Sequence, residues 1–205
     1  MKKIIISLCL ITSAIYFPQQ AYSVYYTRPN VNIKFVDSNT TAEQYLQKAL
    51  ANEKLGNITG AISDCSDAIR RDSNYVPAYM NRARLYNKNG NFLAASADYG
   101  KVLRLEPTNY EALYQRAETY RKTRNDMGAI SDYNKLIDKN YRTADAYVGR
   151  GLVNYNMKRY SYTLKDLEKA LELYPKDSDK YNSTLVLIKQ IQENSSIKST
   201  LTGVD

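Results

Sequence analysis

Two columns of opposite charge run along the sequence, and their residue types and spacing are those that could do chemistry. The acidic column recurs every 34 residues and consists of Asp64, Asp98, Asp132 and Asp166. The basic column has the same period and consists of Lys48, Arg82, Arg116 and Arg150. Stacked carboxylates could bind a metal ion or a basic substrate. Carboxylates level with a guanidinium instead form bidentate ion pairs, so the columns predict either an acidic ladder or a set of structural ion pairs.

The absence of certain residue types excludes several kinds of catalytic mechanism. None of the 205 residues is His, which excludes Ser-His-Asp and Cys-His mechanisms and any His-ligated metal. Glu111 and Glu118 are the candidate acid and base of an enzyme, but carboxylates spread along a periodic surface lack the paired, desolvated setting that tunes such groups. Cys65 lies in a column of core residues, which favours a buried thiol over a reactive one. We expect no enzyme, no cofactor and no metal.

Residues 76–109 are predicted to form two helices that position both columns. Tyr79, Ala83 and Tyr86 follow one another at i, i+4 and i+7, which places them on one face of a first helix. Asn89 and Gly90 then supply a left-handed helix end. A second helix carries an apolar stripe and is closed by a proline, in the order Ala95, Tyr99, Val102, Leu103 and Pro107.

The same unit recurs without a gap over residues 42–75, 76–109, 110–143 and 144–177. Counted from the start of each unit, the eighth place holds a small residue, and these are Ala49, Ala83, Ala117 and Gly151. The twentieth place is also small, with Ala61, Ala95, Ala129 and Thr163. Small residues at both places let two antiparallel helices approach closely. The basic column at place seven and the acidic column at place twenty-three lie equally far from the turn, so we expect ion pairs rather than a ladder.

This pattern of large, small and aromatic residues, then Ala-x3-aromatic and Pro, resembles the tetratricopeptide repeat family over residues 42–177. The resemblance implies an all-α fold, an α-solenoid of stacked antiparallel helix hairpins. We expect four units, a capping helix over 178–196 and a frayed tail over 197–205. The chain departs from the pattern at Arg124 and Lys158, which replace the glycines between the helices, and at Asn154, which replaces an aromatic residue.

The resemblance also implies a concave groove lined by places two, five, nine, twelve and thirteen of each unit. Its apolar floor is predicted to be Leu46, Met80, Tyr114 and Val148, although packing between successive first helices is the alternative role for these residues. The other groove residues are predicted to be Lys54, Arg84, Asn87, Lys88, Glu118, Arg121, Lys122 and Tyr155, with Glu53 and Glu111 beside them. The family's grip on a C-terminal carboxylate does not carry over, because Asn81 alone matches it.

The N-terminal residues 1–23 are predicted to be a signal peptide. Lys2 and Lys3 precede an apolar stretch over 4–17 that is too short to span a bilayer, and the segment ends in a small-x-small site. We expect export to the periplasm or beyond the cell, with cleavage after Ser23 and a retained leader as the alternative. Residues 24–41 are predicted to be a linker or N-terminal arm, and Thr41 and Gln44 have the spacing of a capping box.

The net charge is basic but is not concentrated in any block. It falls from +8 to +6 when the two leader lysines are removed, and Lys and Arg alternate with Asp and Glu along the chain. The sequence favours a non-enzymatic, exported scaffold that binds a peptide or protein with acidic and apolar residues. The alternative is a cell-envelope or membrane-surface adaptor that uses the positive charge. Export disfavours nucleic acid as a partner.

Overall fold

The computed structural model describes residues 22–23, 36–37 and 39–202, and the chain divides into two units, Met1–Thr40 and Thr41–Asp205. In the first unit, strand β1 (Tyr22–Ser23) pairs antiparallel with β2 (Val36–Asp37), with Tyr22 opposite Asp37. The predicted signal peptide and arm lie outside the described residues except at these strands and at residues 39–41. Their roles stay predictions.

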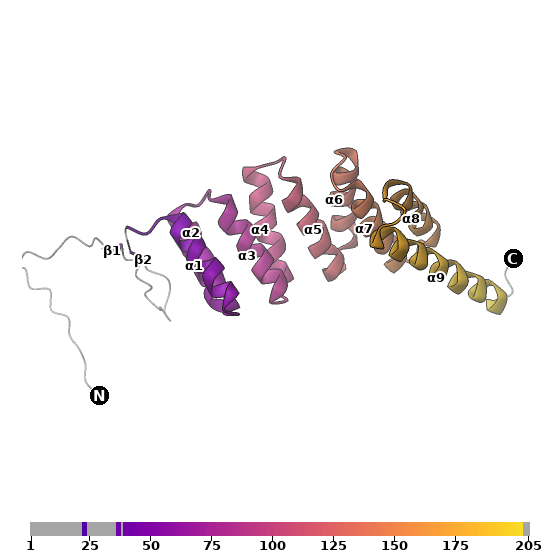
Figure 1. The fold of residues 1–205 in the computed structure, drawn as a ribbon, viewed down its shortest axis with the longest axis horizontal. Helices are drawn as coiled ribbons and strands as arrows, with labels where there is room; N and C mark the ends of the chain where they lie inside the picture. The colour runs from indigo at the N-terminus through magenta and orange to yellow at the C-terminus, as the bar shows by residue number, and fades with distance from the viewer. Residues whose placement is uncertain (1–21, 24–35, 38, 203–205) are drawn as a thin grey trace, which may run out of the picture. The chain divides into compact units, whose positions relative to one another are not determined.

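The second unit is a row of helices in which each helix packs against the next one along the chain (Figure 1). Four hairpins, one in each predicted 34-residue unit, are followed by a longer helix. The helices are α1 (Ala42–Lys54), α2 (Ile58–Arg71), α3 (Val76–Lys88), α4 (Phe92–Leu105), α5 (Tyr110–Thr123), α6 (Asp126–Asp138), α7 (Thr143–Asn156), α8 (Tyr160–Leu173) and α9 (Asp179–Thr202). The predicted α-solenoid of stacked hairpins is confirmed.

Side-chain caps explain where most of these helices begin. Thr41 and Gln44 form the predicted capping box at the start of α1, with a 3.2 Å bond from the Gln44 amide to the Thr41 hydroxyl. The second helices of the first three units share another cap: an asparagine side chain accepts a hydrogen bond from the backbone three residues later, at Asn57, Asn91 and Asn125. In the fourth unit the corresponding residue is Arg159, and α8 has no side-chain cap.

The turn inside each hairpin requires one residue in the left-handed backbone region. Gly56 and Gly90 adopt it with φ of 78° and 75°. Arg124 and Lys158, the two departures from the repeat pattern, adopt the same conformation with φ of 61° and 60°. The stacked helices therefore impose the turn even where the residue carries a Cβ and the conformation is less favourable.

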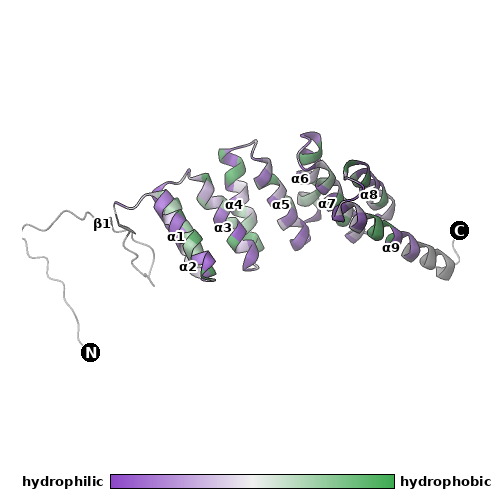
Figure 2. Cartoon of the chain, in the orientation of Figure 1, coloured by the Kyte–Doolittle hydropathy of each residue, from purple (hydrophilic) through white to green (hydrophobic). Residues whose placement is uncertain are grey.

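The core consists largely of alanine, with leucine and tyrosine as its main large residues, and every helix carries both apolar and polar residues (Figure 2). The small residues at places eight and twenty are buried, as close helix approach requires. Tyr99 and Tyr133 are 1% and 0% exposed and fill the space beside those contacts. Cys65 occupies the same column in the first unit and is also buried, as predicted.

Helix α9 covers the end of the repeat array. Ile188 and Ile191 are buried and pack in one cluster with Leu167 of α8. The helix runs to Thr202, whereas the sequence predicted a cap ending at residue 196 and a frayed tail beyond it. None of the helices in the described part of the chain is both long and apolar enough to cross a bilayer.

Candidate interaction groove

The two charged columns pair inside three of the four units. Arg82 donates two hydrogen bonds to Asp98 at 2.8 Å each, and Arg116 binds Asp132 in the same way. Arg150 binds Asp166 with bonds of 2.9 and 2.6 Å. All three aspartates are buried. These carboxylates are therefore engaged between the two helices of a hairpin and are not a free acidic ladder.

In the first unit, the aspartate of the acidic column has a different hydrogen-bond partner. Among the described residues no ion pair joins Lys48 to Asp64, and Asp64 instead accepts a 2.7 Å bond from the Asn52 amide. Asn154 stands at the same place in the fourth unit, is buried, and lies 3.4 Å from the Asp166 carboxylate. Asn154, which replaces the aromatic residue of the repeat pattern, thus donates a hydrogen bond to the aspartate of the acidic column. The predicted column of four equivalent pairs is wrong for Lys48.

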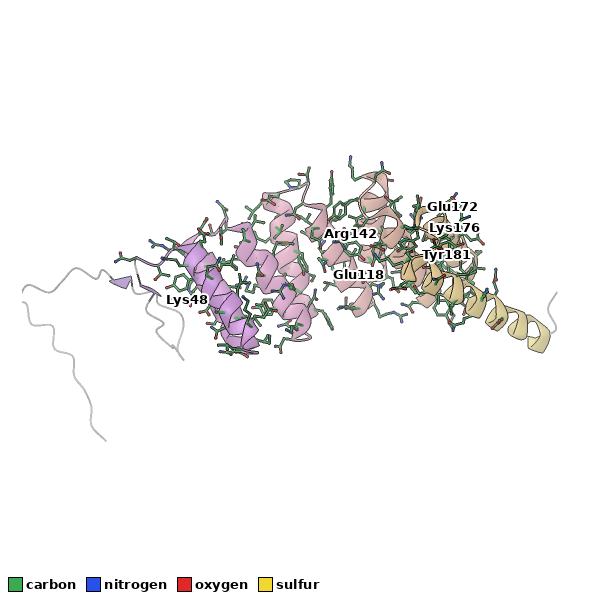
Figure 3. All side chains as sticks on the ribbon, viewed as in Figure 1. Lys48, Glu118, Arg142, Glu172, Lys176 and Tyr181 are labelled. Carbon is green, nitrogen blue, oxygen red and sulfur yellow. The ribbon has the colours of Figure 1, made fainter. Side chains whose placement is uncertain are left out.

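The first helices of successive units touch, because α1 contacts α3, α5 contacts α7, and Asn87 of α3 is hydrogen-bonded to Thr119 of α5. Their outer side is the predicted groove, and Figure 3 labels Glu118 and Arg142 in the middle of the array. Leu46 is 7% exposed and belongs to the core of the first unit, so packing is its role. Met80, Tyr114 and Val148 are half-buried and pack against neighbouring cores, which leaves part of each on the surface.

Ion pairs between units line this surface. Glu53 of α1 accepts two bonds from Arg84 of α3, at 2.6 and 2.5 Å, and Lys88 lies 3.7 Å away. Hydrogen bonding from Arg84 lowers the pKa of the Glu53 carboxyl, and the charges of Arg84 and Lys88 add to this effect. The carboxylate is thus held ionised between two first helices.

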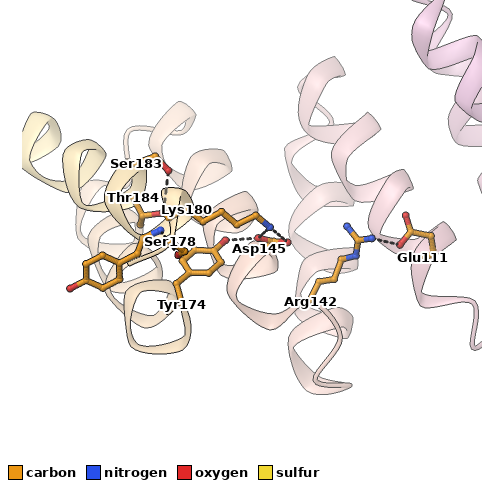
Figure 4. A network of polar contacts seen from close by, with 9 residues as sticks. Glu111, Arg142, Asp145, Tyr174, Ser178, Lys180, Ser183 and Thr184 are labelled. Atoms are coloured by element: carbon orange, nitrogen blue, oxygen red, sulfur yellow. Dashed lines mark hydrogen bonds and ion pairs between the residues drawn. The ribbon is translucent and has the colours of Figure 1, made fainter. Parts of the chain in front are cut away.

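Further polar contacts join α5 to the turn before α7, and α7 to α9 (Figure 4). Glu111 accepts a 2.8 Å bond from Tyr141 and pairs with Arg142 at 3.0 Å. Burial alone would raise the pKa of Glu111, but hydrogen bonds from Gln115 and Tyr141 and the charge of Arg142 lower it.

Asp145 of α7 makes the contacts toward α9. It accepts hydrogen bonds from Tyr174 and, at 2.7 and 2.8 Å, from Lys180. Burial again opposes ionisation, but the bonds from Lys180 and Tyr174 prevail and lower the pKa of Asp145. The groove surface is therefore bonded to the capping helix through this carboxylate.

Three further polar groove residues, Glu118, Arg121 and Asn87, also have internal partners. Glu118 accepts hydrogen bonds from Tyr133 and, at 2.7 Å, from Arg121. Burial and the nearby Glu118 charge raise the pKa of Tyr133, so its hydroxyl stays a donor. The Asn87 amide donates a 2.9 Å bond to Thr119. These contacts fix the groove side chains before any partner arrives.

A row of exposed lysines occupies one place of the repeat on this surface. Place thirteen of the first three units holds Lys54, Lys88 and Lys122, and all three are exposed. Within the described residues, Lys88 alone of the three lies within 4 Å of a carboxylate. Lys122 lies 5.9 Å from the Phe92 ring, and the fourth unit has Asn156 at this place. Tyr155, the last predicted groove residue, is 38% exposed and packs edge-on against Tyr160.

The sequence did not indicate several residues that build this surface, namely Tyr133, Tyr141, Arg142, Asp145, Tyr174 and Lys180. One signal was present, since place two is acidic in both the third and the fourth unit, at Glu111 and Asp145. Their partners stand at different places of the units, so column alignment alone does not find them. The described residues contain no group of three or more Asp, Glu or Cys placed to hold a metal ion.

Comparisons with known proteins agree with this architecture. Models of the tetratricopeptide repeat match residues 76–109 and 111–141. A search of curated proteins found no match.

Three solved structures illustrate the likeness in fold. MamA from Desulfovibrio magneticus RS-1 is 17% identical, with a TM-score of 0.62 over 74% of this chain and 93% of that one. A tetratricopeptide repeat protein from Parabacteroides merdae ATCC 43184 is 21% identical, with a TM-score of 0.66 over 75% and 60%. YrrB, described as a TPR protein with an unusual peptide-binding site, is 16% identical, with a TM-score of 0.57 over 80% and 92%. Residues 76–109 and 111–141 therefore match tetratricopeptide repeats, and the four stacked hairpins share the fold of these structural neighbours.

Proposed function

We propose that this protein is a non-enzymatic interaction scaffold whose groove binds a peptide segment with acidic and apolar residues. The observation that carries the proposal is the row of exposed lysines, Lys54, Lys88 and Lys122, along a surface whose carboxylates already have internal partners. A peptide bound along the groove would face the positive charges of these three lysines. Met80 and Tyr114, which are half-buried on the same helices as Lys88 and Lys122, offer apolar contacts. The peptide-binding site named for YrrB supports a peptide as the class of partner.

The state of the groove carboxylates supports the non-enzymatic part of the proposal. A general acid needs a raised pKa, whereas the pKa of Glu111 is lowered by its bonds to Gln115 and Tyr141 and by Arg142. Glu118 is bound by Arg121 and Tyr133 and shares no hydrogen bond with Glu111 in the described structure. The two carboxylates therefore lack the paired setting of an acid–base site.

Export is a further part of the proposal and rests on the leader pattern of residues 1–23. Expression of the full chain with a C-terminal tag, followed by fractionation and N-terminal sequencing, tests it. A mature N-terminus at Val24 outside the cytoplasm is expected. An intact Met1 terminus on a cytoplasmic protein would contradict export without bearing on the groove.

The groove is tested by selection from a displayed library of random peptides. The groove variant carries Lys88→Glu and Lys122→Glu. The control variant carries Lys101→Glu and Lys135→Glu, two lysines with the same 34-residue spacing on the second helices. Circular dichroism first establishes that both variants are folded.

Wild type and control should enrich peptides that contain Asp or Glu beside apolar anchors, and the groove variant should lose them. The proposal fails if the groove variant enriches the same peptides as wild type. It also fails if wild type enriches no acidic peptides. Salt-sensitive binding to anionic vesicles, weakened equally in both variants and without peptide enrichment, would favour the membrane-surface alternative.

A further inference from the structure

A second surface feature lies away from the groove, between α6, α7 and α8. It is a cavity of about 400 Å³, large enough for a small molecule. Its α7 residues include Tyr147, Arg150 and Asn154, at i, i+3 and i+7 of one helical face. The groove residues Val148 and Tyr155 lie on another face of the same helix.

The cavity wall is strongly basic. Four cations line it, and the one carboxylate in the wall is Asp166, which Arg150 already binds with two hydrogen bonds. Lys169 pairs with Glu172 at 2.7 Å, in a contact whose two side chains are 48% and 61% exposed. Arg159 and Lys165 therefore provide positive charge that the wall itself does not balance.

These two cations occur in the fourth unit only. At place sixteen the first three units have the capping residues Asn57, Asn91 and Asn125, and the fourth has Arg159. At place twenty-two they have Ser63, Ala97 and Ser131, and the fourth has Lys165. The fourth unit thus lacks the asparagine cap of α8 and carries a cation in its place.

The wall between the two cations changes in the same way. Place nineteen is small in the first three units, with Gly60, Ala94 and Gly128, and the fourth unit has Tyr162. Tyr162 is 63% exposed, although it is a large aromatic residue beside a cavity. Places sixteen, nineteen and twenty-two are spaced by three residues, so all three changes fall along one side of α8. They give this side two cations with an aromatic ring between them.

We propose that this cavity binds a small phosphorylated ligand. Arg159 and Lys165 bind the phosphate, whose charge and three acceptor oxygens match basic donors that line the same cavity. Tyr162 packs against the body of the ligand, as exposed aromatic side chains do in binding sites. Arg150 stays paired with Asp166 and holds Asn134 through a 2.6 Å bond, which fixes the wall opposite. The site is independent of the groove and of the peptide proposed to bind there.

The test uses the intact chain and measures pyrophosphate binding by isothermal titration calorimetry at low ionic strength. The site variant carries Arg159→Asn and Lys165→Ser, which installs the residues of the third unit and restores an asparagine cap to α8, so it should fold. The control variant carries Lys48→Ser and Lys189→Ser, which removes the same charge from exposed positions on α1 and α9.

Wild type and control should bind pyrophosphate with equal affinity, and the site variant should bind about tenfold or more weakly, because charge-assisted hydrogen bonds are lost. Tyr162→Ala should weaken phenyl phosphate and leave pyrophosphate unaffected. The proposal is overturned if wild type shows no saturable binding, or if the control loses as much affinity as the site variant. It is also overturned if an oligoglutamate peptide binds the site in preference to pyrophosphate, since the cavity would then be a protein contact.

Discussion

The Arg116–Asp132 ion pair offers the most direct test of how the hairpins are held together. We expect Arg116→Ala to lower the free energy of unfolding without changing the affinity of a groove ligand. The Asp132 side chain is 3% exposed, and both its oxygens accept 2.8 Å bonds from Arg116. Truncation of the arginine removes both donors and leaves a buried carboxylate unpaired.

The size of the effect follows from this burial. Removing one partner of a fully buried pair costs about 3–5 kcal/mol. The Arg116 side chain is 20% exposed, so water reaches part of the vacated space and the lower end, about 3 kcal/mol, is expected. For a chain of this size, that loss corresponds to a fall of roughly 6–12 °C in the thermal midpoint.

Urea unfolding followed by circular dichroism measures the loss against two further variants. Lys122→Ala truncates an exposed cation at the end of the same helix and should change stability by less than about 0.5 kcal/mol. The double variant Arg116→Met, Asp132→Leu removes both charges, keeps the side-chain bulk and should recover most of the loss.

The reasoning is refuted if Arg116→Ala costs less than about 1 kcal/mol, because the carboxylate would then be solvated as in a surface pair. It is also refuted if the double variant is as unstable as the single one, since lost packing would then explain the whole effect. Weaker binding of a groove ligand at unchanged stability would move Arg116 from the hairpin core to the binding surface.

The remaining predictions concern the turns, the groove carboxylates and the thiol. Lys158→Gly should raise the free energy of unfolding by about 1 kcal/mol, because it relieves a left-handed residue, and a decrease in urea unfolding would contradict this. The lowered pKa values of Glu53 and Asp145 provide stability that is present above their unfolded pKa values near 4 and is lost as pH falls through the folded values. Urea midpoints from pH 7 to 3 should therefore fall less steeply in Asp145→Asn than in wild type. Burial raises the pKa of Cys65 to about 11, so a thiol reagent should modify native protein at pH 8 far more slowly than urea-unfolded protein.

The repeat fold was predictable because its determinants recur at a fixed period. Tyr79, Ala83 and Ala95 each have equivalents one period away, and together they specify a face, a close approach and a hairpin. Arg124 and Lys158 depart from the repeat pattern, yet both adopt the left-handed conformation of the glycines that they replace. Packing of neighbouring helices is sufficient to impose a turn at one place when the rest of the unit is in register.

The groove was only partly predictable, because contacts between units do not follow the period. Glu53 binds Arg84, 31 residues away, and Asp145 binds Lys180, 35 residues away. The spacing depends on how one hairpin is rotated against the next, which a column alignment does not contain. Leu46 shows the same limit, since its column predicted a groove floor while packing in the core of the first unit buries it.

The periodic and the aperiodic residues consequently carry different information in this protein. A residue that recurs in every unit, such as the buried alanines or the aspartates of the acidic column, reflects the stacking that each hairpin must satisfy. Arg159, Tyr162 and Lys165 break three such columns within one unit and along one side of one helix. Stacking does not require these changes, because the first three hairpins form without them. Loss of the asparagine cap and exposure of an aromatic ring both lower stability. We assign a binding role to the fourth unit because a ligand would account for keeping these unfavourable changes.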